Sequence, residues 1–262
     1  MKEVDEALSR AFAQRKPAGP SSAVPPPPHW ATRFAAPEVV HPRTVQPAVD
    51  PQPQEELEWP AIVLLLEEKW GYRFEQMADR LIEARDRQNL KVLLFTSCHR
   101  AEGRTTLVLT LARALARRAG RTLLVDADLT GPMLARSLGL RPTLGLDDVV
   151  EEGHALADAI LNAPDDHLWI LPLRAPVARP REFLASSGWS CAMARLRRDF
   201  DLVLVDGSPM FAGLSAAVLH RSVDAAVLVH NRSMTGERSL LRAREVLDGG
   251  GVPLLGLAET FV

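Results

Sequence analysis

Short apolar runs alternate with helical patterns along the greater part of this chain. Residues 91–95 and 121–125 are dense in branched apolar side chains, which is the pattern of strands buried on both faces. Between them, residues 105–118 repeat leucine and alanine at helical spacing, and Gly120 ends the helical pattern. Residues 96–104 are polar, so the chain turns there. The pattern predicts a strand, a turn, a helix and a second strand.

The same alternation continues toward the last residues. Further strands are predicted at residues 167–171, 201–205, 223–230 and 253–257, and helices at residues 61–89 (as one or two helices), 132–139, 155–161, 189–198, 213–220 and 234–247. Strands that alternate with helices indicate an α/β fold, with a mostly parallel sheet covered by helices on both faces. In such sheets ligands bind at the carboxyl ends of the strands. The residues that fall at such ends are Gly103, Asp126, Asp128 and Asp206.

The first 60 residues differ in composition from the rest. Residues 2–16 place apolar side chains on one helical face, but a helix this short is marginal in water. It is either a docking helix for a partner or a frayed helix that packs weakly on its own domain. The following segment is rich in proline, which favours an extended, disordered linker. The predicted organisation is a short helix over residues 1–16, a linker over 17–60 and one domain over 61–262.

The turn before the first long helix nearly matches the P-loop, in which a glycine, a lysine and a hydroxyl residue bind phosphates and magnesium. Here these positions are Gly103, Arg104 and Thr105. A strand, a turn and a helix N-terminus make a phosphate site, because free backbone N–H groups and the positive end of the helix dipole point the same way. The predicted nucleotide-binding residues are Ala101, Glu102, Gly103, Arg104, Thr105 and Thr106.

Three motifs together resemble one family. They are Thr96-Ser97 with Glu102-Gly103-Arg104-Thr105-Thr106, then Leu124-Val125-Asp126-Ala127-Asp128, then Leu204-Val205-Asp206-Gly207-Ser208-Pro209. In order and spacing they are similar to the bacterial tyrosine kinases of capsule and exopolysaccharide synthesis, a branch of the ParA/MinD-like P-loop ATPases. The resemblance covers about residues 74–262 and implies ATP or ADP and Mg²⁺ as cofactors.

The resemblance also implies roles for Thr105 and for the three aspartates of the motifs. Thr105 would supply a magnesium ligand, and Asp206 would hold a metal-bound water. Asp126 and Asp128 would lie near the γ-phosphate, where the family uses them for metal binding and for polarising the attacking group. The predicted catalytic residues are therefore Asp126, Asp128 and Arg104, and the predicted metal site is Thr105, Asp126 and Asp206. The alternative is that the two aspartates after the strand merely cap the following turn.

Arg104 stands where the family has lysine, and three interpretations stay open. It binds phosphate with poor turnover, because a planar guanidinium is longer than the ammonium for which the loop is shaped. Alternatively, it fills the pocket or pairs with Asp206, and nucleotide binding is lost. The third interpretation is an active enzyme that tolerates arginine. Ala101 replaces a family glycine and Arg100 a proline, and both changes stiffen or crowd the loop.

These observations leave several functions open. The family phosphorylates a tyrosine cluster at its C-terminus, whereas the only tyrosine in these 262 residues is Tyr72. The expected function is therefore a nucleotide-binding regulator of polysaccharide assembly or export that is weakly active or inactive. The alternatives are an active ATPase or protein-tyrosine kinase, and a ParA/MinD-like positioning ATPase. A structural module without nucleotide remains the fourth hypothesis, if Arg104 fills the pocket.

Composition narrows the compartment and the partners. A net charge of −2 argues against nucleic-acid binding, and two cysteines favour a reducing cytoplasm. No apolar run reaches the length of a membrane helix, so no direct membrane span is expected. The resemblance implies recruitment to the inner face of the membrane by a polysaccharide co-polymerase-type activator. It also implies a homo-oligomer, although only Glu75 and Arg80 remain of the family's Glu-x-x-Arg-x-x-Arg motif, at a different spacing.

Overall fold

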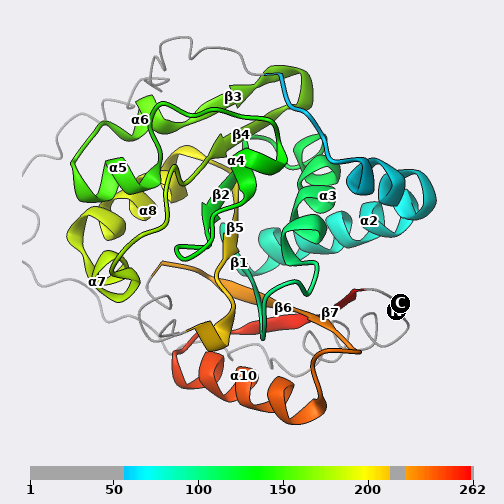
Figure 1. The fold of residues 1–262 in the computed structure, drawn as a ribbon. Helices are drawn as coiled ribbons and strands as arrows, with labels where there is room; N and C mark the ends of the chain where they lie inside the picture. The colour runs from blue at the N-terminus through cyan, green and yellow to red at the C-terminus, as the bar shows by residue number, and fades with distance from the viewer. Residues whose placement is uncertain (1–55, 213–221, 261–262) are drawn as a thin grey trace, which may run out of the picture.

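A seven-stranded sheet runs through the molecule, with helices on both of its faces (Figure 1). The computed structural model describes residues 56–212 and 222–260. Across the sheet the strands follow the order β3-β4-β2-β5-β1-β6-β7. Their bounds are β1 Val92–Ser97, β2 Thr122–Ala127, β3 Leu161–Ala163, β4 Leu168–Leu171, β5 Leu202–Gly207, β6 Ala225–Asn231 and β7 Leu254–Thr260.

Six of the seven strands are parallel, which confirms the predicted fold class. The central strands β1, β2 and β5 are buried along their whole length, as expected for strands covered on both faces. The short strand β3 was not predicted, and it pairs antiparallel with β4 at the sheet edge. The helix expected over residues 155–161 is shorter, because α6 ends at Ala159 and the chain then extends into β3.

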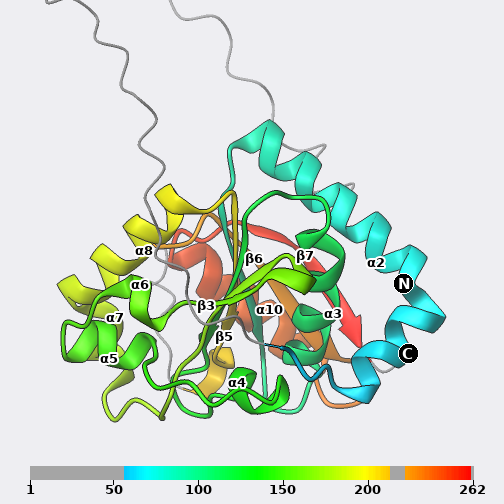
Figure 2. The ribbon, with the colours of Figure 1, turned by 90° about the horizontal axis from the view of Figure 1, so that it is seen from above.

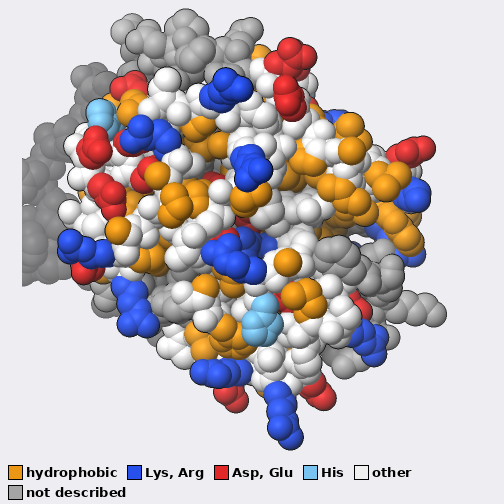
Figure 3. Space-filling view, in the orientation of Figure 1, with side chains coloured by type: hydrophobic (Ala, Val, Ile, Leu, Met, Phe, Trp, Pro, Cys, Tyr) orange, Lys and Arg blue, Asp and Glu red, His pale blue; other side chains and the backbone are white. Residues whose placement is uncertain are grey.

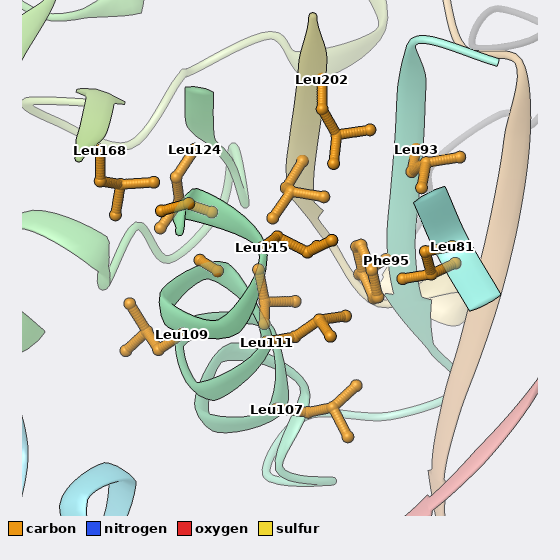
Figure 4. Packing of buried hydrophobic residues seen from close by; sticks show 14 of the residues in the cluster. Leu81, Leu93, Phe95, Leu107, Leu109, Leu111, Leu115, Leu124, Leu168 and Leu202 are labelled. Carbon is orange, nitrogen blue, oxygen red and sulfur yellow. The ribbon is translucent and has the colours of Figure 1, made fainter. Parts of the chain in front are cut away.

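One face of the sheet is covered by α2 (Ala61–Gln88) and α3 (Arg104–Ala116). Figure 2 shows both helices on the same side of the sheet, and Figure 4 shows the leucines of α3 beside the buried residues of the strands, with Leu81 of α2 next to Phe95. The fully buried side chains at this interface include Leu111, Leu115 and Phe95. Since α2 is a single continuous helix, the prediction of one or two helices is resolved in favour of one.

The aromatic side chains near α2 differ in whether they pack against the core or stay exposed. Trp59 and Phe74 pack against the core. Trp70 is 41% exposed and lies under the guanidinium of Arg73. Hydrophobic side chains gather on the surface over α2 (Figure 3), and Ile62 is among the exposed ones.

The opposite face is covered by α5, α7, α8 and α10, which pack on a second apolar cluster. Its largest buried side chain is Trp189, whose indole N–H donates to Ser222 Oγ at 2.9 Å. The helices and short turns of the remaining chain are α4 Leu134–Ser137, α5 Leu146–Glu151, α6 Leu156–Ala159, α7 Pro180–Ala185, α8 Ser187–Asp199 and α10 Glu237–Gly249, with 3₁₀ turns at Pro164–Asp166 and Met210–Ala212.

Several predictions concern residues outside the described part of the chain. These are the helix at residues 1–16, almost all of the linker at residues 17–60 and the helix at residues 213–220. Within residues 56–212 and 222–260, no helix has both the length and the apolar content needed to cross a bilayer.

Candidate nucleotide site at the carboxyl ends of the parallel strands

The predicted site residues meet where β1, β2 and β5 end. Asp126 of β2 is the register partner of Asp206 of β5, and Asp206 is in turn the register partner of Phe95 in β1. The loop after β1 then leads directly into α3. The sequence-based expectation that Asp126, Asp206 and the loop share one edge of the sheet therefore agrees with the structure.

The loop that enters α3 depends on two left-handed residues. Gly103 has φ 78° and ψ 11°, a conformation that glycine adopts without steric cost. Ala101 has φ 60°, a left-handed conformation that is costly for a residue with a Cβ. Within the described residues no side chain caps the N-terminus of α3, so the amides of its first turn stay available to an anion.

Arg104 points into the site rather than out of it. Its Nε donates to Asp206 Oδ1 at 2.6 Å, its Nη2 donates to Asp128 Oδ2 at 2.9 Å, and its Nη1 donates to Ser97 Oγ at 3.2 Å. The side chain is 8% exposed. Burial by itself would lower the pKa of the guanidinium, but the charges of Asp206 and Asp128 outweigh that effect and raise the pKa above its ordinary value. Arg104 is thus a fixed, buried cation.

The pairing of Arg104 with Asp206 belongs to the second interpretation of this residue. The structure shows the pairing itself, and it adds Asp128 as a second acceptor that the sequence did not suggest. The other half of that interpretation, the loss of nucleotide binding, does not follow from the pairing. No side chain caps the first turn of α3, so its amides are not taken by a side-chain acceptor within the described residues.

Asp126 is engaged by the backbone of the following turn. Its Oδ1 accepts from the N–H of Asp128 at 3.1 Å, and its Oδ2 accepts from the N–H groups of Met133 at 3.1 Å and Leu134 at 2.9 Å. Burial, with the charge of Asp206, raises the pKa of the Asp126 carboxyl to about 7, although the backbone donors oppose the shift. For Asp126, these contacts are the ones expected if it caps the turn that follows β2. Asp128 accepts from Arg104 Nη2 instead.

Glu102 faces away from the P-loop interior and fastens the loop to the neighbouring strand. One carboxylate oxygen accepts from the N–H of His99 at 2.6 Å. The other accepts from the N–H of Asn231 at 3.3 Å and from the hydroxyl of Thr235. The side chain is buried. These bonds give the Glu102 side chain a structural role in the loop, and its nucleotide contact stays a prediction.

The structure also brings in residues that belong to the quoted motifs or the loop but were not among the predicted catalytic, nucleotide-binding or metal residues. Ser97 accepts from Arg104, and Ser208 Oγ accepts from the N–H of Leu129 at 3.0 Å. Arg100 lies at the rim, with Nη1 3.5 Å from Asp128 Oδ2. Both serines lie at the carboxyl end of a strand or just beyond it, and this position was the available signal. Thr106 follows Thr105 in α3 and is half-buried.

The predicted metal ligands do not fit a hydrated magnesium ion in this arrangement. Magnesium takes oxygen ligands in near-octahedral geometry and keeps several waters. Thr105 Oγ1 donates to Asp206 Oδ2 at 2.7 Å, and both oxygens of Asp126 accept backbone N–H groups. In the part of the chain that the structure describes, no group of three or more His, Cys, Asp or Glu side chains is arranged to hold a metal.

Comparison with known proteins places this geometry in a family context. No family model matches the chain. The chain is 31% identical to the tyrosine-protein kinase YwqD of Bacillus subtilis (strain 168) over 172 residues, which are 65% of this chain and 72% of that protein. The solved kinase domain of VpsO is similar with a TM-score of 0.66 and 26% identity, covering 75% of this chain and 98% of that one. The septum site-determining protein MinD of Pyrococcus horikoshii OT3, complexed with Mg-ADP, is similar with a TM-score of 0.54 and 26% identity over 64% of this chain and 68% of that one.

Proposed function

Because the chain belongs to the family of the bacterial tyrosine-protein kinases, we propose that it binds ATP or ADP at the P-loop and acts as a regulator with little or no phosphoryl transfer. Identity to YwqD over most of that protein supports the nucleotide part, as does the likeness to a MinD protein solved with Mg-ADP. The uncapped first turn of α3 supplies backbone donors for phosphate.

The bonding of Arg104 is the observation that carries the regulatory part of the proposal. A P-loop lysine reaches the phosphates as a compact point charge. The guanidinium of Arg104 is instead held by Asp206 and Asp128, so its charge is already paired with carboxylates of the protein. Reacting groups that are displaced by ~1 Å lose about a hundredfold in rate. We therefore expect nucleotide binding that is not followed by efficient transfer.

The biological setting is proposed from the family resemblance. In this proposal residues 61–262 form the nucleotide-binding domain, and residues 1–16 dock on a partner. The partner is the cytoplasmic part of a membrane polysaccharide co-polymerase, which recruits the chain to the inner face of the membrane. The process regulated is capsule or exopolysaccharide assembly. Such a role rests on analogy between pathways, and the site chemistry does not specify the polymer.

Calorimetric titration with ADP and ATP, in magnesium-containing buffer, tests this function. The natural protein should bind both nucleotides and release almost no phosphate. Arg104→Lys restores the compact ammonium and should add measurable hydrolysis. If neither protein binds nucleotide, the proposal is wrong. If the natural protein turns over ATP and Asp206→Ala abolishes the turnover, the chain is an active ATPase or kinase instead.

A further inference from the structure

The positive charge at the centre of this site is the guanidinium of Arg104. Arg104 reaches Asp206 at 2.6 Å and Asp128 at 2.9 Å, and each of the three side chains is 8% exposed or less. The second oxygen of Asp206 accepts from the hydroxyl of Thr105 at 2.7 Å. Two of the side chains predicted to hold magnesium are therefore bonded to each other, and one of them is bonded to a fixed positive charge.

A magnesium ion and this guanidinium compete for the carboxylate of Asp206, to which Arg104 Nε donates. The guanidinium is planar and always charged, and it binds carboxylates through a rigid fork of N–H donors. A divalent ion placed against Asp206 while Arg104 stays in position would meet like-charge repulsion in a buried region, where salt screens weakly. The ion can enter only if Arg104 leaves.

Asp126 offers no second route for the ion. Both of its oxygens accept backbone N–H groups, from Asp128 on one side and from Met133 and Leu134 on the other. A metal bound to Asp126 would replace those bonds and leave buried donors unpaired, which is costly. Each of the predicted metal ligands, Thr105, Asp126 and Asp206, is thus already hydrogen-bonded to another group of the protein.

We infer that Arg104 takes the place of the divalent ion, so that the site excludes magnesium and binds nucleotide without it. The nucleotide half rests on the proposed function, whereas the exclusion of the ion concerns the protein alone. In this arrangement the guanidinium neutralises part of the charge of Asp128 and Asp206 that would otherwise repel phosphates. Nucleotide affinity therefore does not follow the magnesium concentration.

The first experiment measures metal retention by the full chain without nucleotide. Mn²⁺ is the probe, because electron paramagnetic resonance counts its free form. Arg104→Met removes the cation and keeps an unbranched side chain that extends about as far as Nε of the arginine. Arg100→Met is the matched control, because Arg100 lies in the same loop, is 52% exposed and reaches Asp128 only at 3.5 Å. The natural protein and Arg100→Met should retain no Mn²⁺, whereas Arg104→Met should retain it.

The second experiment measures fluorescent ADP binding in excess Mg²⁺ and in EDTA. For the natural protein the two dissociation constants should agree within about twofold. For Arg104→Met they should differ by about tenfold or more, with tighter binding in Mg²⁺. If circular dichroism shows that Arg104→Met is unfolded, Arg104→Lys replaces it, because the shorter ammonium no longer spans both carboxylates.

Three outcomes would overturn the inference. In the first, the natural protein retains Mn²⁺, or its ADP binding is about tenfold tighter in Mg²⁺. In the second, the folded Arg104 variants gain neither metal retention nor a metal-dependent affinity, which would mean that Arg104 is not what excludes the ion. In the third, the Arg100→Met control also gains Mn²⁺. Absence of ADP binding by the natural protein in both buffers would refute the proposed function, while the Mn²⁺ comparison would still decide the exclusion of the ion.

Discussion

Removing Arg104 should destabilise the whole domain, because its charge compensates two buried carboxylates. Asp128 and Asp206 are 5% and 2% exposed, and Arg104→Met would remove the cation that bonds both of them, while Arg100 stays 3.5 Å from Asp128. Breaking a buried pair by removing one partner costs about 3–5 kcal/mol. With an m-value of about 2.5 kcal/mol/M, the urea midpoint should fall by about 1.2–2 M.

Urea unfolding in EDTA measures this effect, since chelation prevents a divalent ion from compensating the carboxylates. The control is Arg87→Met on α2, whose pair with Glu83 at 2.6 Å is largely exposed. Its loss should cost only about 0.3–0.5 kcal/mol. Adding Asp206→Asn to Arg104→Met should recover part of the stability, because it removes one uncompensated charge. A loss below about 1 kcal/mol for Arg104→Met would refute the reasoning, because surface pairs are worth that much.

Three further predictions concern other groups. Because the pKa of Asp126 is raised to about 7, the folded protein binds more protons than the unfolded chain between about pH 4 and pH 7. The stability of the fold should therefore fall as pH rises through that window. Asp126→Asn should flatten this fall in thermal melts. Burial raises the pKa of the Cys98 thiol to about 11, so iodoacetamide should label only the exposed Cys191 until the protein is denatured. Mass spectrometry of the labelled peptides checks this, and labelling of Cys98 before denaturation would contradict it. Gly103→Ala should cost about 1–2 kcal/mol in urea unfolding because φ is 78°, and an unchanged midpoint would contradict the left-handed turn.

The parallel core of the fold was predictable because its signals are local. The apolar runs that predicted β1, β2 and β5 hold residues that are buried throughout these strands. The helix ends before Gly120, because the C-cap of α3 is Arg117, and Gly120 at φ 77° lies in the turn that follows. The failures arise where tertiary contact overrides a local pattern. The helix predicted over residues 155–161 ends at Ala159, and residues 161–163 form β3, because pairing with β4 extends the sheet at its edge.

The composition of the site was readable, but its internal bonding was not. Strand ends and the glycine-containing turn place Asp126, Asp206 and Arg104 together without any long-range information. Which donor each carboxylate accepts depends on side-chain reach across segments that are far apart in sequence. The three interpretations of Arg104 could therefore not be separated from the sequence, and the bonds of the Glu102 side chain to Thr235 and Asn231 could not be foreseen.

The difference between lysine and arginine at this position is then one of geometry more than of charge. A lysine ammonium donates from a single nitrogen, so it can turn from a carboxylate to a phosphate at little cost. Arg104 donates to Asp206, Asp128 and Ser97 at once from three nitrogens, and moving it would break all three bonds together. A site that releases its cation only at that cost favours a bound state over a catalytic cycle. The same substitution therefore accounts for both proposals, weak phosphoryl transfer and independence from magnesium.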